Sequence, residues 1–216
     1  MSMLDLSDVQ AEALARLEAK HRAREAALAT SRKATRAAAN AIRATHRGDR
    51  ERAESLLGES AEALRGAKAA CAGQPEVEHA GFLADAQKEY AEAGTTFALI
   101  TGKPLPGPRD LGVGEAAWLN GLAETVGELR RHLLDVLRSG DLERSESLLA
   151  AMDDIYAMLV TIDYPEGVTA GLRRSTDVAR AIIERTRGDL TLALVQARLE
   201  KALTAHARDV LGSDPG

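Results

Sequence analysis

Cysteine and aromatic residues are scarce in this chain of 216 residues, and their scarcity excludes several kinds of protein. The single cysteine, Cys71, cannot form an intrachain disulfide framework or a cysteine zinc site. Aromatic residues make up 3% of the sequence, so alanine and leucine must build most of the core. No apolar run approaches the roughly 18 residues of a transmembrane span, and the start, MSMLDLSDVQAEAL, lacks the basic and apolar regions of a signal peptide. We therefore expect a soluble, cytoplasmic protein.

Glycine and proline interrupt a sequence that otherwise repeats with helical periodicity. Glycine followed by aspartate occurs at 48–49, 140–141 and 188–189, and this pair is typical of a helix that ends where a capped helix begins. Pro75 fits the first turn of a helix. The segment 101–114, with three prolines and four glycines, has the composition of a loop.

These boundaries predict an all-α fold without strands. The first helix is expected between Ser7 and His46, either as one long helix or as two in series. Later helices are expected after Asp49, at 75–100, at 115–139, over the segment from Leu148 to Ile162, and at 168–187 and 189–211. The short turns predict a single domain over residues 1–216, an antiparallel bundle of about seven helices, with a frayed tail at 212–216.

Two pairs of glutamates lie on the predicted helices that flank the 101–114 loop. Glu89 and Glu92 lie beside the apolar stripe of the first helix, and Glu124 and Glu128 lie beside that of the second. A short connection makes the two helices neighbours, so antiparallel packing would bring the four carboxylates together. Such a set of oxygens suits Mg²⁺ or Mn²⁺, and a bound ion could polarise a phosphoryl oxygen. Metal-assisted phosphodiester hydrolysis is a reaction that needs these residue types.

Two other interpretations of the acidic residues remain open. Glutamates three or four apart are common on solvated helices, where Lys88 and Arg131 could pair with them. The Glu-x-x-His spelling of di-iron bundles also occurs twice, although one histidine follows a helix start and the other lies among basic residues. The two matches are Glu18 with His21 and Glu76 with His79.

Basic residues recur at near-helical spacing on an early and a late predicted helix. They suit contacts with phosphates, but ion pairs with nearby acids would use them equally well. The net charge of −5 argues against a simple basic binding surface, and Asp177 and Glu184 share the face of the late arginines. The candidates for nucleic-acid binding are Arg32, Arg36, Arg43, His46, Arg131, Arg173 and Arg180.

Four segments resemble the translin family. QKEYAEA (87–93) is similar to the QEYVEA-type motif of translin-associated factor X, and WLNGLAETVGELRR (118–131) is similar to that family's YLLGxADxxGELxR segment. Residues 31–49 resemble the family's early helix, and residues 163–190 resemble its late helix in prokaryotic translin-like proteins. The resemblance covers roughly residues 22–195, and the second motif is its most specific part.

The resemblance implies a helical bundle that assembles into octamer-like shells and binds single-stranded RNA and DNA. The factor X branch is a Mg²⁺-dependent endoribonuclease, which implies catalytic and metal-binding roles for Glu89, Glu92 and Glu124, with Glu128 as a further acidic position. Position 124 holds glutamate where the factor X motif has aspartate.

We therefore expect a homo-oligomeric endoribonuclease for single-stranded RNA, with Mg²⁺ or alternatively Mn²⁺ as its ion. One alternative is a non-catalytic member of the same family that binds single-stranded RNA or DNA. Another is a helical assembly protein without a nucleic-acid role.

Overall fold

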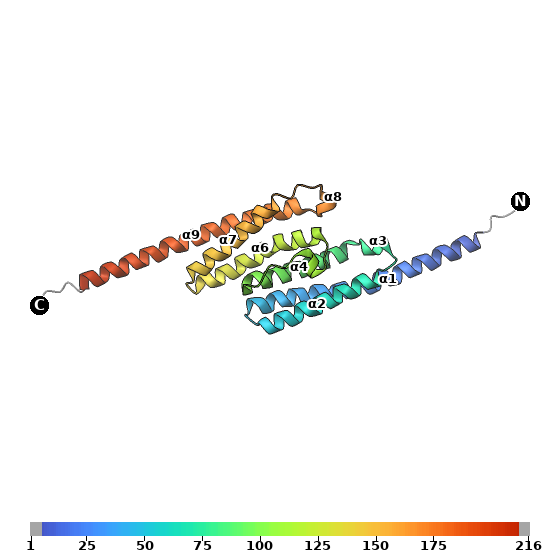
Figure 1. The fold of residues 1–216 in the computed structure, drawn as a ribbon, viewed down its shortest axis with the longest axis horizontal. Helices are drawn as coiled ribbons and strands as arrows, with labels where there is room; N and C mark the ends of the chain where they lie inside the picture. The colour runs from blue at the N-terminus through green and yellow to red at the C-terminus, as the bar shows by residue number, and fades with distance from the viewer. Residues whose placement is uncertain (1–5, 212–216) are drawn as a thin grey trace. The chain divides into compact units, whose positions relative to one another are not determined.

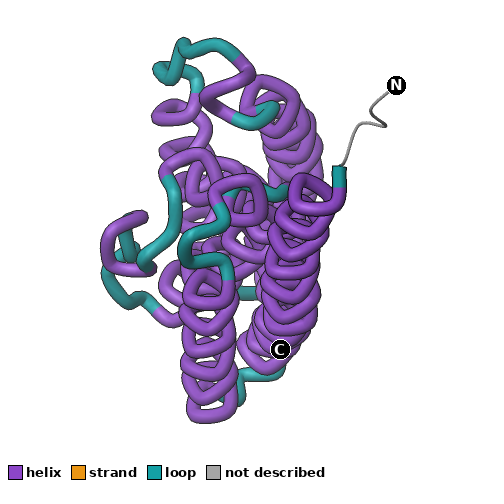
Figure 2. Tube along the Cα trace, turned by 90° about the vertical axis from the view of Figure 1, so that its right-hand side faces the viewer, coloured by secondary structure: helices purple, strands orange, loops and turns teal. Residues whose placement is uncertain are grey.

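The computed structural model describes residues 6–211, and within them the chain forms helices joined by turns and loops, without strands (Figures 1 and 2). The all-α prediction is confirmed. Six of these helices have 18 residues or more and three have a single turn of four residues. They are α1 (Ser7–His46), α2 (Arg50–Ala70), α3 (Pro75–Glu78), α4 (Gly81–Thr101), α5 (Pro108–Leu111), α6 (Glu115–Arg138), α7 (Leu142–Leu159), α8 (Glu166–Thr169) and α9 (Leu172–Leu211). In this part of the chain, none of the helices combines the length and hydrophobicity that crossing a bilayer requires.

Two of the three glycine–aspartate pairs form the predicted turns. Gly48 and Gly140 have left-handed φ angles of 75° and 86°. The Asp49 carboxylate then accepts a hydrogen bond from the backbone N–H of Arg52, and Asp141 caps α7 in the same way. Since glycine adopts a positive φ without steric cost, this pair ends one helix and starts the next efficiently.

The prediction of a third such turn at Gly188–Asp189 is wrong. Residues 188 and 189 lie inside α9, which continues without interruption for 40 residues. Thr186 and Leu190 are buried on either side of the pair. The Asp189 carboxylate accepts a hydrogen bond from Arg130 of α6 at 2.7 Å, so tertiary contacts hold the helix where local propensity would end it.

Two other predicted boundaries also shift. The helix expected at 75–100 is split, because Ala80 has an extended backbone (φ −70°, ψ 139°) between α3 and α4. The helix expected from 168 starts at Leu172, because Ala170 and Gly171 both have left-handed φ angles, of 51° and 81°. The expected loop at 101–114 contains the single turn α5.

The chain divides into two compact units, and the first comprises residues up to Leu122 together with 167–170. In this unit α1 packs along both α2 and α4. Its contact face is built from alanines that are completely buried, which lets the helices approach closely: Ala27, Ala34, Ala38, Ala41 and Ala44. The Ser60 hydroxyl of α2 donates to the Ala34 carbonyl at 2.9 Å and joins the two helices of the hairpin.

The second unit comprises residues 123–166 and the chain from Gly171 onward. Here α7 packs against α9, and the Arg187 guanidinium donates to both Asp153 carboxylate oxygens, at 2.6 and 2.9 Å. Arg130 of α6 donates to the Thr186 hydroxyl at 2.9 Å as well as to Asp189. Buried aliphatic side chains form the interior: Val126, Leu129, Leu133, Leu148, Met152, Ile155, Leu159 and Ile183.

The first turns of α1 and the last turns of α9 expose apolar side chains. Leu14 and Leu17 are 58% and 60% exposed on α1. On α9 the exposed apolar residues recur three and four apart, as Leu192, Val195, Leu199 and Leu203. We call these four residues the α9 stripe.

Candidate metal site and nucleic-acid interface

Helix α4 places Glu89 and Glu92 at the edge of its buried face. The residues between and beside them, Tyr90, Ala91 and Ala93, are buried, whereas the two glutamates are half-buried. The Lys88 ammonium lies 3.7 Å from the Glu89 carboxylate. The pair therefore occupies the border between core and solvent, where a carboxylate can meet both a ligand and water.

Gly121 brings α6 into direct contact with the α4 backbone at this position. A Cβ at residue 121 would stand 2.6 Å from the Lys88 carbonyl oxygen and 2.9 Å from both the Ala91 Cβ and the Glu92 nitrogen. Real Cβ atoms essentially never approach within 3.0 Å of other heavy atoms, so this site accepts only glycine. Gly121, the first glycine of the WLNGLAETVGELRR motif, thus sets how closely α4 and α6 approach.

The segment between α4 and α6 is tied down by hydrogen bonds of its own. The Trp118 indole N–H donates to the Pro106 carbonyl at 2.9 Å, and the Gly114 N–H donates to the Gln87 side chain at 3.1 Å. Lys68 of α2 donates to the Gly112 carbonyl at 2.6 Å. These bonds fix the start of α6 relative to α4.

Glu124 lies one turn after Gly121 on the uninterrupted helix α6. Glu89, Glu92 and Glu124 are all half-buried, and each offers a carboxylate oxygen within 4.8 Å of the other two. We call these three residues the carboxylate group. At such separations and an effective dielectric constant of about 20, each pair of charges repels by roughly 3 kcal/mol. A cation would relieve this repulsion.

The donor set fits Mg²⁺ or Mn²⁺. Both ions prefer carboxylate oxygens and keep several water ligands, and three carboxylates leave coordination positions for water. Oxygens on opposite sides of a Mg²⁺ ion lie about 4 Å apart, which is compatible with the upper limit of 4.8 Å within the group.

Glu128 lies outside the carboxylate group. Its carboxylate is 3.9 Å from the Arg131 guanidinium, one turn beyond Glu124. The structure thus brings together three of the four predicted acids, and the metal-binding role of Glu128 stays a prediction.

The di-iron alternative has no support in the structure. His21 is exposed, and the carboxylate of its neighbour Glu18 lies 3.7 Å from Arg22. Glu76 pairs with Lys20. Among the described residues, neither Glu-x-x-His pair belongs to a group of three side chains able to hold a metal ion.

The predicted nucleic-acid contacts occupy different surroundings. Arg32, Arg36 and Arg43 are exposed on α1, and His46 at its end is half-buried. Arg131, Arg173 and Arg180 are exposed on α6 and α9. Arg180 donates to Glu184 at 3.1 Å, and this hydrogen bond raises the pKa of the guanidinium. Arg180 therefore forms an ion pair within α9, and its role in nucleic-acid binding stays a prediction.

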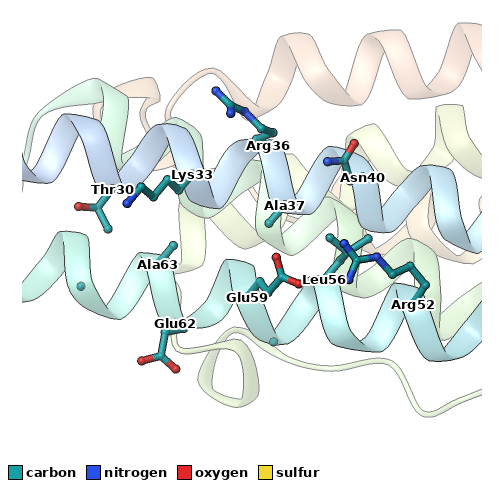
Figure 3. A pocket seen from close by; sticks show the side chains of 12 residues that line it. Thr30, Lys33, Arg36, Ala37, Asn40, Arg52, Leu56, Glu59, Glu62 and Ala63 are labelled. Carbon is teal, nitrogen blue, oxygen red and sulfur yellow. Dashed lines mark hydrogen bonds and ion pairs between the residues drawn. The ribbon is translucent and has the colours of Figure 1, made fainter.

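A groove of about 770 Å³ between α1 and α2 was not predicted from the sequence (Figure 3). Its sides carry Lys33 and Arg36 from α1 and Arg52 and Glu59 from α2, with Arg52 paired to Glu59 at 3.3 Å. Glycines 58 and 66 of α2 also line it.

Comparison with known proteins places this helical arrangement in a family. No family profile matches the chain. An uncharacterized protein of Methanocaldococcus jannaschii is 31% identical over 186 residues, which cover 85% of this chain and 82% of that protein. The solved structure of AfC3PO is 38% identical, with a TM-score of 0.81 over 88% of this chain and 98% of that chain. This chain belongs to the translin family.

Two further translin-family structures extend the comparison. AfC3PO in complex with duplex RNA gives the same identity, TM-score and coverage as AfC3PO alone. The structure of apo-NeC3PO is 21% identical, with a TM-score of 0.75 over 89% of this chain and 100% of that chain, and shows that the fold is shared. The carboxylate group thus lies on the two translin motifs, QKEYAEA in α4 and WLNGLAETVGELRR in α6.

Proposed function

We propose that this translin-family protein binds RNA as a homo-oligomer and cleaves single-stranded RNA as a Mg²⁺-dependent endoribonuclease. The carboxylate group is the observation that carries the proposal, because three half-buried carboxylates on two closely packed helices offer oxygens within 4.8 Å of one another, a donor set that suits a divalent cation. Family membership supports the same role for Glu89, Glu92 and Glu124.

The chain's own residues have distinct roles in this proposal. The three glutamates would hold Mg²⁺, with Mn²⁺ as the alternative ion. When bound, such an ion supplies an activated water and polarises a phosphoryl oxygen. The contact between Gly121 and the Lys88 carbonyl fixes the separation of the two helices, and Lys88 balances part of the negative charge at Glu89. Exposed arginines would bind the phosphates on either side of the cleaved bond.

RNA binding is supported by the complex of AfC3PO with duplex RNA. Single-stranded RNA as the substrate, and single-stranded DNA as a second ligand, follow from the family resemblance. Both forms of RNA therefore belong in the first experiment.

A homo-oligomer is supported by the exposed apolar ends of α1 and α9. The four residues of the α9 stripe are 55–61% exposed in one chain. Apolar side chains that recur three and four apart on a helix usually pack against another helix. We propose a second copy of this chain as that neighbour, in an octamer-like shell.

The test is cleavage of end-labelled RNA, single-stranded and duplex, with Mg²⁺ or with EDTA. We expect cleavage only with Mg²⁺, and its loss in Glu89→Gln and Glu124→Gln, which keep the side-chain shape but remove a charged ligand. Glu62→Gln is the matched control, because Glu62 is an exposed glutamate paired with Arg65 on α2. Cleavage that continues unchanged in both ligand variants would disprove the site.

The alternative is a non-catalytic protein that binds single-stranded RNA or DNA. Glutamate at position 124, where the factor X motif has aspartate, is the observation that favours it, since Mg²⁺ coordination is sensitive to ligand position. This alternative predicts salt-dependent binding without metal-dependent cleavage. The variant Glu124→Asp separates the two, because it should create cleavage activity only if the wild-type residue prevents it.

A further inference from the structure

The second half of α6 carries a hollow next to the proposed active site. Its volume is about 470 Å³, and its lining residues all belong to α6: Gly127, Arg130, Arg131, Leu134, Asp135 and Arg138. Gly127 lies one turn after Glu124, so the hollow begins beside a member of the carboxylate group. Three arginines and one aspartate line the hollow itself, while Asp189 and Glu128, which lie beside Arg130 and Arg131, are outside its lining.

Two of the three arginines are available to a ligand. Arg130 is held by Thr186 and Asp189 and forms part of the wall. Arg131 is 58% exposed, and its guanidinium lies 3.9 Å from Glu128, beyond hydrogen-bond distance. Arg138 is 78% exposed and pairs with Asp135 at 2.6 Å. Exposed pairs of this kind contribute little to stability, so a phosphate could replace the carboxylate with little loss.

Gly127 leaves room for a ligand at the end of the hollow nearest Glu124. A Cβ there would meet only the Ile182 side chain, at 3.9 Å, which is an ordinary contact. Unlike Gly121, this glycine is not required by the packing of a neighbouring helix. Glycine inside a helix is unfavourable relative to alanine, and it often marks a place where a ligand approaches the backbone.

The exposed arginines lie in line with Glu124, the member of the carboxylate group on α6. Residues 124, 128, 131, 135 and 138 are four and three apart and therefore share one face of α6. At about 1.5 Å per residue, Arg131 and Arg138 lie roughly 10 and 21 Å from Glu124 along the helix axis. A chain of phosphates that extends from the carboxylate group would meet both arginines in turn.

We propose that this hollow is a subsite for the phosphodiester backbone of RNA, which runs from the carboxylate group toward the C-terminal end of α6. The inference rests on the proposed function, because the RNA is the substrate that the carboxylate group would cleave. The arginines contact phosphates and not bases, so the subsite contributes affinity and direction without sequence preference.

The test measures binding of fluorescein-labelled single-stranded RNA by anisotropy in EDTA, where no cleavage is expected. Arg138→Ala should weaken binding about tenfold at low salt and lower the slope of log K against log salt by about 0.7, the value for one phosphate contact on a single strand. Asp135→Asn removes the carboxylate that pairs with Arg138. It should tighten RNA binding about two- to threefold, which matches the small free energy of one exposed ion pair. Arg65→Ala is the control, because Arg65 forms a similar exposed pair, with Glu62 at 3.2 Å on α2.

The outcomes separate this subsite from the nuclease proposal. If Arg138→Ala and Asp135→Asn both bind like the wild type, the subsite is wrong, even if the wild type cleaves RNA with Mg²⁺. If binding depends on Arg138 but the wild type never cleaves RNA, the subsite stands and the nuclease proposal fails. Displacement of the RNA by polyglutamate as readily as by unlabelled RNA would also overturn the subsite, since it would show a surface for any polyanion.

Discussion

Gly121 lies so close to the Lys88 carbonyl that a single added methyl group would stand 2.6 Å from its oxygen. This contact joins the two motif helices next to Glu89 on α4 and one turn before Glu124 on α6. The separation of the glutamates therefore depends on a residue that has no side chain.

Replacing Gly121 with alanine should destabilise the protein and impair the site together. The new Cβ would clash with backbone atoms that cannot rotate away, and overpacking of this kind costs about 1–3 kcal/mol. We expect a lower urea midpoint, weaker Mn²⁺ binding and slower RNA cleavage.

Gly58→Ala is the matched control for this substitution. Gly58 also lies inside a helix, α2, but no atom lies within 4 Å of a Cβ placed there. This variant should be unchanged or more stable by up to about 1 kcal/mol. If both variants lost the same stability, the close contact at Gly121 would not be the cause.

Mg²⁺ should stabilise the folded protein, and the effect should require the carboxylate group. A ligand that binds only the native state at 100 times its Kd adds about 2.7 kcal/mol to the free energy of unfolding, or roughly 5–10 °C in Tm for a chain of this size. In EDTA, Glu89→Gln and Glu124→Gln should melt above the wild type, because one repelling charge is gone. In Mg²⁺ they should melt below it.

Thermal unfolding in EDTA and in Mg²⁺ measures both effects. At a metal site, the variants should melt above the wild type in EDTA and below it in Mg²⁺. At a solvated acidic patch, neutralising one charge would have the same small effect on Tm in both buffers. Glu62→Gln should keep the wild-type response in each buffer.

The α9 stripe should control assembly. Leu199→Asp places a charge in the middle of the four exposed apolar residues, and burying it against a second copy would be costly. We expect a smaller particle by light scattering coupled to size exclusion, with unchanged helicity by circular dichroism.

Thr204→Asp adds the same charge on a different side of α9 and serves as the control for assembly. It should leave the particle mass unchanged. A mass that stays the same in Leu199→Asp as well would show that the α9 stripe is not an interface.

Cys71 should be unreactive until the protein unfolds. Its side chain is completely buried at the end of α2, and burial, together with the negative charge of Glu78, raises the pKa of the thiol. At pH 8 the native thiol therefore stays protonated, whereas the unfolded thiol ionises more readily. Ellman's reagent should react slowly in buffer and rapidly in urea, and fast reaction of the native protein would contradict the buried position.

The sequence was sufficient to predict the helical class and three members of the carboxylate group. Periodicity placed Glu89 and Glu92 beside a buried stripe, and the short connection made Glu124 their neighbour. The same local signal failed at Gly188–Asp189, because burial of Thr186 and Leu190 and the bond from Arg130 outweigh a helix-ending tendency that succeeds at Gly48 and Gly140.

Other features depend on distances that no spacing rule contains. Gly121 and Gly127 look alike in the sequence, but one meets the α4 backbone and the other meets little besides Ile182. The groove between α1 and α2 likewise depends on how far apart two helices lie. Such differences come from packing, which the pattern of residue types leaves undetermined.

The hydrogen bonds around the connection from α4 to α6 also determine where the chain tolerates an inserted peptide. Pro106, Gly112 and Gly114 are each anchored, whereas Pro104 and Leu105 are exposed. A peptide tag inserted between residues 104 and 105 would leave every anchor in place. Evolution can lengthen this connection for the same reason, without moving the glutamates on either side of it.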